Sequence, residues 1–159
     1  MIDGINGLHH IAISTGRWDQ MLKFYRDTLG FAEVDGFEWR AGDETSEVAD
    51  AVTGLRGSGA RVAMLKGRNA CIELFEYYSP EPKPVDPNRP VNDHGLTHIC
   101  LDVTDVEAVY NALLARGMRF HTHVQEMGDG IRGTYGRDPD GNVVEIQELL
   151  KRDDPARIF

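Results

Sequence analysis

The chain lacks the features that mark secreted proteins and membrane proteins. Its 159 residues include two cysteines, Cys71 and Cys100, which are too few for a disulfide scaffold. Both lie in apolar runs, as buried thiols do in a reducing compartment. No apolar run approaches the roughly 18 residues of a membrane-spanning helix, and the first residues lack the basic and apolar segments of a signal peptide. We therefore expect a cytoplasmic protein without a membrane partner.

Positive charge is also in short supply. The chain has 17 Lys and Arg residues against 26 Asp and Glu residues, which gives a formal net charge of −9. Such a protein repels nucleic acid and anionic lipid surfaces, so both are poor partners for it. The length predicts a single domain, residues 1–159, that is large enough to bury a core without disulfides.

A weak internal repeat divides the chain into two halves. Residues 8–13 (LHHIAI) open the first half and residues 96–101 (LTHICL) open the second, so His10 and His98 occupy the same position. An amphipathic helical pattern follows in each half and ends at a glycine, Gly30 or Gly117. Two copies of one pattern predict two copies of one supersecondary unit.

Each half is predicted to run strand, helix and then about three strands. Periodicity and turn residues carry this prediction, because strands alternate apolar and polar residues while helices repeat every three to four. The predicted strands are 10–14, 31–37, 61–66 and 70–77 in the first half, and 97–103, 120–124, 131–137 and 143–149 in the second; the predicted helices are 18–29 and 106–116, with a short additional helix inside 42–59.

The two halves are separated by a proline-rich segment. Five prolines lie between residues 79 and 92, and proline fixes φ and removes a backbone donor, so this segment is predicted to be an extended connector. Module one then covers about 7–78, module two about 93–149, and a charged tail 150–159. The fold class is α+β, with two βαβββ modules forming a curled mixed sheet.

Two histidines and two glutamates stand at matched positions of the repeat. Glu73 lies in the closing run of the first half, and Glu145 lies in that of the second. Together with His10 and His98 they suit one six-coordinate divalent metal ion, such as Ni, Co, Zn, Mn or Fe. His9 competes with His10, but neighbouring strand residues point to opposite faces, and only His10 aligns with His98.

These residues stand in motifs that resemble the vicinal oxygen chelate superfamily, which includes glyoxalase I, methylmalonyl-CoA epimerase and extradiol dioxygenases. The motifs are residues 23–31 (KFYRDTLGF), 95–99 (GLTHI) and 138–145 (DPDGNVVE), and the resemblance covers about residues 7–149. It implies two βαβββ modules around a metal-binding cup, and, by analogy, a homodimer. His10, Glu73, His98 and Glu145 match the metal-facing positions of this family.

The resemblance to glyoxalase I and to the epimerase implies a metal-dependent lyase or isomerase. In such an enzyme a metal-site glutamate removes a proton next to a carbonyl, so Glu145 or Glu73 would be the base. Methylmalonyl-CoA epimerases carry a glutamine where this chain has Glu73, and the chain has no evident basic cluster for the phosphates of coenzyme A.

Two alternatives remain open at this point. An extradiol-type ring-cleaving dioxygenase would bind iron through two His and one Glu, with a further His and Tyr nearby. Tyr135 precedes Asp138 much as that tyrosine would, and His121 and His123 are the candidate histidines, which we expect to share one face of a strand. The other alternative is a drug-resistance protein that binds a small molecule without catalysis.

Overall fold

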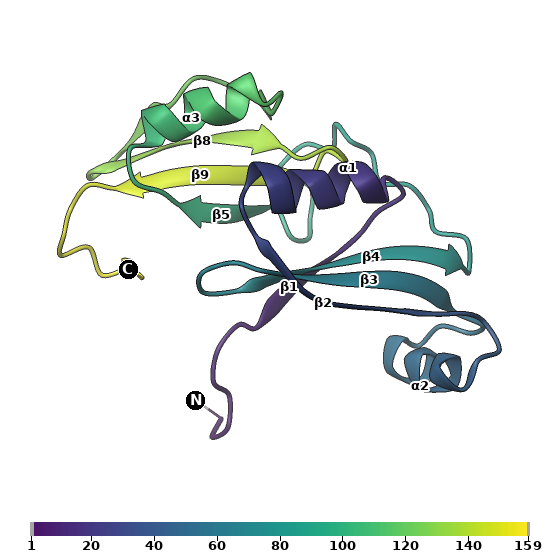
Figure 1. Ribbon diagram of the computed structural model, residues 1–159. Helices are drawn as coiled ribbons and strands as arrows, with labels where there is room; N and C mark the ends of the chain where they lie inside the picture. The colour runs from purple at the N-terminus through teal and green to yellow at the C-terminus, as the bar shows by residue number, and fades with distance from the viewer. Residues whose placement is uncertain (1, 159) are drawn as a thin grey trace. The chain divides into compact units, whose positions relative to one another are not determined.

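The structure is a computed structural model that describes residues 2–158 (Figure 1). The chain divides into two compact units between Pro84 and Val85. No helix among the described residues is both long and apolar enough to cross a membrane. Each unit carries its own sheet, and the predicted α+β class with two βαβββ modules is confirmed.

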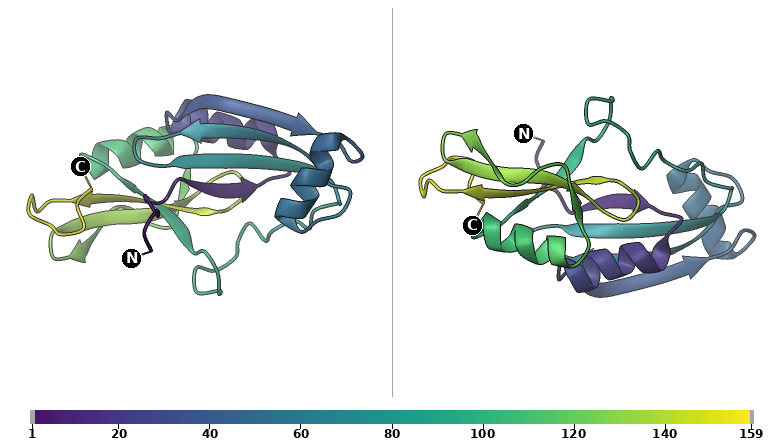
Figure 2. Two further views of the ribbon diagram at one scale, coloured as in Figure 1. Left: turned by 90° about the horizontal axis from the view of Figure 1, so that it is seen from below. Right: turned by 90° about the horizontal axis from the view of Figure 1, so that it is seen from above.

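Unit 1 contains a four-stranded sheet in the order β1-β4-β3-β2. β1 lies at one edge and pairs in parallel with β4, while β3 pairs antiparallel with both β4 and β2. α2 lies across the end of the sheet at which β2 ends and β3 begins (Figure 2). The elements are β1 (His10–Ser14), α1 (Trp18–Leu22), the π-helix η1 (Lys23–Thr28), β2 (Ala32–Trp39), α2 (Glu44–Thr53), β3 (Gly59–Lys66) and β4 (Cys71–Ser79).

The core of unit 1 lies between its sheet and the α1–η1 segment. Met21 and Tyr25 from this segment are almost completely buried, as is Leu74 of β4. The alternate residues of β1 and β4, including Ile13 and Ile72, are also buried and share the face of Leu74, so this face packs against the helix. The opposite face of the sheet therefore carries His10 and its alternate neighbours.

One helix of unit 1 differs from its prediction. The amphipathic pattern over 18–29 predicts a single α-helix, but the chain changes to π-helical hydrogen bonding at Lys23. The Leu29 N–H donates to the Phe24 carbonyl at 2.9 Å, which is a five-residue spacing. The wider turn still buries Phe24 and Tyr25, so the core contact that the pattern predicts is kept.

Unit 2 contains a sheet in the order β5-β9-β8-β6, with β7 pairing separately with β8. β5 lies at the edge and pairs in parallel with β9, as β1 pairs with β4 in unit 1. The elements are β5 (His98–Asp102), α3 (Val106–Ala115), β6 (Arg119–Phe120), β7 (Gln125–Gly128), β8 (Ile131–Arg137) and β9 (Val143–Leu149). The predicted tail, residues 150–159, has no helix or strand as far as residue 158, and Phe159 lies outside the described residues.

The strand predicted at 120–124 is wrong. β6 ends at Phe120, and residues 121–123 form a bend before β7 begins at Gln125. Two hydrogen bonds hold this bend: the His121 N–H donates to the Tyr135 carbonyl, and the Thr134 hydroxyl donates to the Thr122 carbonyl. Since the bend interrupts the pleat, residues 121 and 123 do not keep the alternation of a strand.

Hydrogen bonds join the turn between β8 and β9 to the second part of the proline-rich connector. Arg137 donates to the backbone carbonyls of Gly141 at 2.6 Å and Arg89 at 3.0 Å. Gly141 has φ +91°, and a Cβ atom there would lie 2.2 Å from the Pro87 carbonyl oxygen. Glycine is therefore required at Gly141 both by backbone conformation and by the close approach of Pro87.

Candidate functional site

In unit 1 the structure brings His10 and Glu73 together. His10 opens the edge strand β1, and Glu73 lies on the neighbouring strand β4 opposite Ala12. Because residues two apart on a strand share a face, the His10 ring and the Glu73 carboxylate extend on the same side of the sheet. His10 Nε2 lies 3.2 Å from Glu73 Oε2.

In unit 2 the structure brings His98 and Glu145 together in the same way. His98 opens the edge strand β5, and Glu145 lies on β9 opposite Cys100. His98 Nε2 lies 3.1 Å from Glu145 Oε2. The Glu145 side chain is 8% exposed and the Glu73 side chain 15% exposed, so both carboxylates are largely withdrawn from water. The two units thus repeat one arrangement with the same strand register.

The spacing within each pair suits two adjacent ligands of one metal ion. A metal ion bound at about 2.1 Å by two ligands at right angles holds the two donor atoms about 3.0 Å apart. The observed separations of 3.2 Å and 3.1 Å are close to that value. Among residues 2–158, however, no group of three or more His, Cys, Asp or Glu side chains is placed to hold a metal ion, so each unit presents a pair of donors. An imidazole and a carboxylate are donors that divalent transition metals accept.

Two groups surround Glu145 on its face of the sheet. The Cys100 thiol is hydrogen-bonded to the Glu145 carboxylate; burial and the negative charge of Glu145 raise the pKa of this thiol to about 12. Tyr135 lies opposite Glu145 on β8, and its ring packs on the His98 ring with a centroid separation of 4.9 Å. Burial, and then the Glu145 charge, also raise the pKa of Tyr135. Both groups therefore keep their protons near neutral pH.

Sequence reasoning missed the contact between Cys100 and Glu145. The signal was present, because Cys100 stands two residues after His98 and a strand alternates its faces. Only the register of β5 against β9 shows that Cys100 lies opposite Glu145. At the same position of unit 1 the chain has Ala12, which offers no donor to Glu73.

The face around Glu73 is lined by aromatic rings. Phe75 and Tyr77 follow Glu73 at alternate positions of β4, and their rings stack with centroids 5.5 Å apart. Trp39 and Phe37 of β2 continue the cluster, with ring centroids 5.8 Å apart. Trp39 is buried and its indole N–H donates to the Ser58 hydroxyl, whereas Phe37 is 57% exposed. Burial, followed by the Glu73 charge, raises the pKa of Tyr77.

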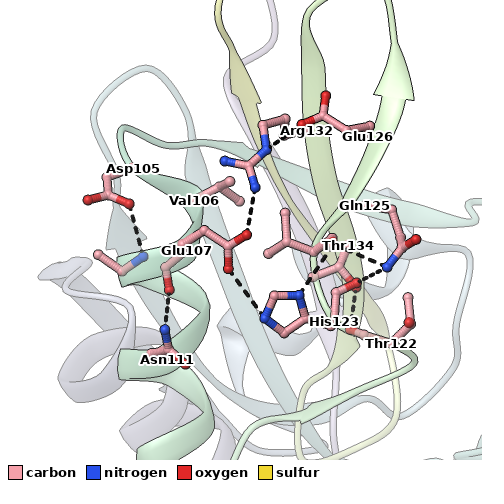
Figure 3. Close-up of polar contacts among 12 residues, drawn as sticks. Asp105, Val106, Glu107, Asn111, Thr122, His123, Gln125, Glu126, Arg132 and Thr134 are labelled. Carbon is pink, nitrogen blue, oxygen red and sulfur yellow. Dashed lines mark hydrogen bonds and ion pairs between the residues drawn. The ribbon is translucent and has the colours of Figure 1, made fainter.

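His121 and His123 do not share a face, contrary to our prediction. The His121 ring lies 6.2 Å from the Tyr135 ring and accepts a hydrogen bond from Arg137, while burial and the Arg137 charge lower its pKa. His123 lies on the side of α3, where its Nε2 is 3.4 Å from Glu107 (Figure 3). The bend over residues 121–123 turns the two side chains to different partners.

Side-chain ion pairs join α3 to the sheet of unit 2, and they involve Glu107, His123 and Arg132. Arg132 of β8 donates to Glu107 at 2.6 Å, and its Nε lies 2.8 Å from Glu126 of β7 (Figure 3). The Arg132 guanidinium contacts both carboxylates, and the His123 ring contacts Glu107 as well, so each carboxylate already has a partner within the cluster. We interpret it as a structural contact, separate from the His98–Glu145 pair.

Comparisons with known proteins agree with this architecture. The family model described as Glyoxalase/Bleomycin resistance protein/Dioxygenase superfamily matches residues 7–146. A 2-epi-5-epi-valiolone epimerase from Actinomyces sp is 30% identical over 156 residues, which cover 93% of this chain and 82% of the epimerase.

Solved structures share the fold at lower identity. A glyoxalase family protein from Bacillus cereus aligns with a TM-score of 0.82 and 21% identity, covering 95% of this chain and 99% of that one. The trypanothione-dependent glyoxalase I of Leishmania major aligns with a TM-score of 0.62 and 19% identity, covering 91% of this chain and 88% of that one.

Proposed function

Because the chain belongs to the glyoxalase, bleomycin resistance protein and dioxygenase superfamily, we propose that it is a divalent-metal-dependent lyase or isomerase. In this proposal a carbonyl-containing small molecule loses the proton next to its carbonyl group. The observation that carries the proposal is the repeated pairing of His10 with Glu73 and of His98 with Glu145 at 3.1–3.2 Å. The epimerase from Actinomyces supports the isomerase form of the reaction.

His10, Glu73, His98 and Glu145 would hold the metal ion, with Ni, Co, Zn, Mn and Fe as the candidates. When bound, the ion supplies Lewis acidity that polarises a substrate oxygen and favours loss of the adjacent proton. All four side chains carry lone pairs suited to such an ion in their neutral imidazole or ionised carboxylate forms.

Glu145 is the candidate base. Its carboxylate is largely buried and lies 3.1 Å from Nε2 of His98, another candidate metal ligand. The Cys100 hydrogen bond orients it, and the raised pKa of the Cys100 thiol keeps that thiol a donor. Glu73 is the second candidate, because an isomerase needs a group that returns the proton.

The first experiment measures the metal content of the tag-free protein by mass spectrometry, beside that of a His98→Ala variant. We expect about one Ni, Co, Zn or Mn ion per chain in the native protein and its loss in the variant. No metal in the native protein, even after incubation with each candidate ion, would refute the catalytic proposal and leave a small-molecule binding protein.

The second experiment tests the base. Turnover of 2-oxoaldehyde–thiol adducts and of 2-substituted acyl thioesters would be screened with the metal-loaded protein. Glu145→Gln should lower kcat by about 10²- to 10⁴-fold, since removal of a general base costs that much. Loss of α-deuterium from a labelled substrate measures the proton transfer itself. Unchanged exchange in Glu145→Gln and in Glu73→Gln would refute the assignment of both bases.

A ring-cleaving dioxygenase is the second candidate function, and a specific observation favours it. Tyr135 packs on the His98 ring, and His121 packs on Tyr135, so a tyrosine and a histidine accompany the candidate ligand. Iron in the purified protein, followed by oxygen consumption with catechols, would support this reaction. Catechol turnover that persists in Tyr135→Phe and His121→Ala would argue against a catalytic role for these two residues.

A further inference from the structure

Two arginines stand directly opposite each other in the sheet of unit 2. Arg119 of β6 pairs with Arg137 of β8, and Arg137 pairs in turn with Val143 of β9. Val143 also pairs with His98 of β5, so one row across the sheet joins the two arginines to a candidate metal ligand. Because directly opposite residues share a face, both arginines lie on the face that carries His98 and Glu145.

The packing of β6 agrees with this orientation. Phe120 follows Arg119, and neighbouring strand residues point to opposite faces. The Phe120 ring packs on Tyr110 of α3, with ring centroids 4.7 Å apart, so Phe120 lies on the face that α3 covers. Arg119 is exposed and extends from the other face, which is the face of the candidate site.

No carboxylate neutralises this arginine pair within residues 2–158. The described strands carry four arginines, and the other two, Arg61 and Arg132, each lie within 2.8 Å of a carboxylate. Arg137 donates instead to three backbone carbonyls and to the His121 ring. Arg119 has no hydrogen-bond or ion-pair partner among the described residues. This contrast is informative because acidic residues outnumber basic ones in the chain, 26 to 17.

An unpaired arginine opposite a second arginine favours the binding of an anion. Like charges that face each other across two strands destabilise a sheet, and an anion beside both guanidinium groups removes that repulsion. The positive charge is felt by a neighbouring group, since burial, and then the charge of Arg137, lower the pKa of His121. The planar fork of a guanidinium group matches the paired oxygens of a carboxylate or a phosphate.

We propose that Arg119, assisted by the charge of Arg137, binds an oxyanion of the substrate, which is a carboxylate or a phosphate group. This inference rests on the proposed function, because it names a second part of the substrate of the same site. Along the sheet, β6 lies two strand spacings from β9 and three from β5, or about 10 Å and about 14 Å. The oxyanion is therefore several bonds away from the carbonyl group, and the substrate class is a carbonyl compound with an anionic far end.

The first measurement follows the Arg119 Nε–H signal in ¹H–¹⁵N spectra of the metal-free protein. Two matched pairs of hydroxyketones are titrated: 5-hydroxy-4-oxopentanoate against its amide, and dihydroxyacetone phosphate against dihydroxyacetone. The members of each pair differ at the far end, where one carries the oxyanion. The charged member of at least one pair should shift the Arg119 signal, and the neutral members should not. A response to one charged compound alone decides between a carboxylate and a phosphate.

Affinities of the same compounds test the role of Arg119 by substitution. Arg119→Gln should weaken binding of the charged compound by about 10-fold, because a hydrogen bond to a charged group is lost. The affinity for the neutral compounds should not change. Arg119→Lys keeps the charge without the fork and should give an intermediate affinity. Arg152→Gln is the matched control, since Arg152 is an exposed arginine beyond the opposite end of β9.

Thermal unfolding tests the repulsion between the two arginines. In the metal-free protein at low salt, Arg119→Gln should raise the midpoint relative to the Arg152→Gln control. The difference should shrink at about 1 M salt, because salt screens the interaction between exposed charges. A lower midpoint in Arg119→Gln than in the control would contradict the repulsion on which the inference depends.

The outcomes separate this inference from the proposed function. If the protein binds metal but Arg119→Gln binds the charged compounds as tightly as the native protein, the oxyanion site is wrong while the metal site stands. If the protein binds no metal and the Arg119 signal still responds to a charged compound, the proposed function fails while the oxyanion site stands. Equal affinity for the charged and neutral members of both pairs would overturn the inference.

Discussion

The two units agree at one edge of their sheets and differ at the other. At the edge that carries the histidine, β1 against β4 and β5 against β9 have the same direction and the same register, so Ala12 lies opposite Glu73 as Cys100 lies opposite Glu145. At the far edge, unit 1 has the eight-residue strand β2, while unit 2 has the two-residue strand β6 followed by a bend.

This difference indicates which part of the module carries the chemistry and which part shapes its surroundings. A one-residue slip of the register would turn Glu73 or Glu145 to the other face of its sheet, so the His–Glu pair demands a fixed register at its edge. The far edge has no such constraint. In unit 1 it supplies Phe37 and Trp39 to an aromatic cluster, and in unit 2 it releases His121 and His123 to separate partners.

Replacement of the central ring in the aromatic cluster should have the largest effect on stability. Trp39 is 4% exposed and packs against Phe37, Phe75 and Tyr77, so Trp39→Ala should lower the free energy of unfolding by about 3–5 kcal/mol. Phe120→Ala on the outer strand of unit 2 is the counterpart and should cost less, because Phe120 is only partly buried. Urea unfolding followed by circular dichroism gives both values. Equal losses of stability in the two variants would contradict the difference between the far edges of the two sheets.

The reactivity of the Cys100 thiol tests the environment of Glu145 at the sheet edge that carries His98. The pKa of Cys100, about 12, keeps its thiol protonated at pH 8, so alkylation by iodoacetamide should be at least about 100-fold slower than for an ordinary thiol. The rate should rise as the pH rises toward 12, because the thiolate is the nucleophile. Burial, the largest cause of the raised pKa, remains in Glu145→Gln, but the Glu145 charge is removed, so this variant should react faster than the native protein. A Cys71→Ser background keeps the measurement specific.

The same measurement compares the two units. Ala12→Cys in a Cys71→Ser, Cys100→Ala background places a thiol opposite Glu73, as Cys100 stands opposite Glu145. We expect this thiol to react slowly too, and to speed up in combination with Glu73→Gln. A fast thiol that does not respond to Glu73→Gln would show that the two edges differ electrostatically.

Alanine substitutions at two glycines should separate the stability cost of a strained backbone from the stability cost of a steric clash. Gly117 and Gly141 both have positive φ, but a Cβ at Gly117 meets no atom within 4 Å, while one at Gly141 meets Pro87. Gly117→Ala should cost about 1 kcal/mol from strain alone, and Gly141→Ala about 3 kcal/mol because the connector must also move. Gly30→Ala in unit 1 should match Gly117→Ala. Similar costs at Gly117 and Gly141 would mean that Pro87 shifts freely.

The smallest effects on stability are expected at Glu76 and Glu148, which occupy the same position of the internal repeat. Glu148 accepts the N–H groups of Asp105 and Val106 at the start of α3, whereas Glu76 pairs with Arg61 at 2.7 Å. Glu148→Gln should cost about 1 kcal/mol, because an amide has one accepting oxygen instead of two. Glu76→Gln should cost less, since the ion pair is partly exposed to water. Thermal unfolding of both variants ranks them, and the reverse order would contradict this account.

Strand and helix periodicity predicted most of the fold. The strands 10–14, 131–137 and 143–149 coincide with β1, β8 and β9, because apolar alternation and the flanking turn residues mark both ends. The strand predicted at 120–124 failed because β propensity depends on neighbours: residues 121–123 bend beside β8, where hydrogen bonds with Thr134 and Tyr135 hold the bend. The π-helical turn at Lys23 also has no signature in a pattern of apolar residues.

The sequence by itself determined the repeat, the positions of His10, Glu73, His98 and Glu145, and the sheet face on which each pair meets, since a strand alternates its side chains with a period of two. Only the tertiary structure decided what surrounds each pair. Cys100 and Tyr135 reach Glu145 through strand register, and His9 and Thr97 reach their histidines through side-chain rotation. Register and rotation depend on packing between distant segments, which a local pattern of residue types does not encode.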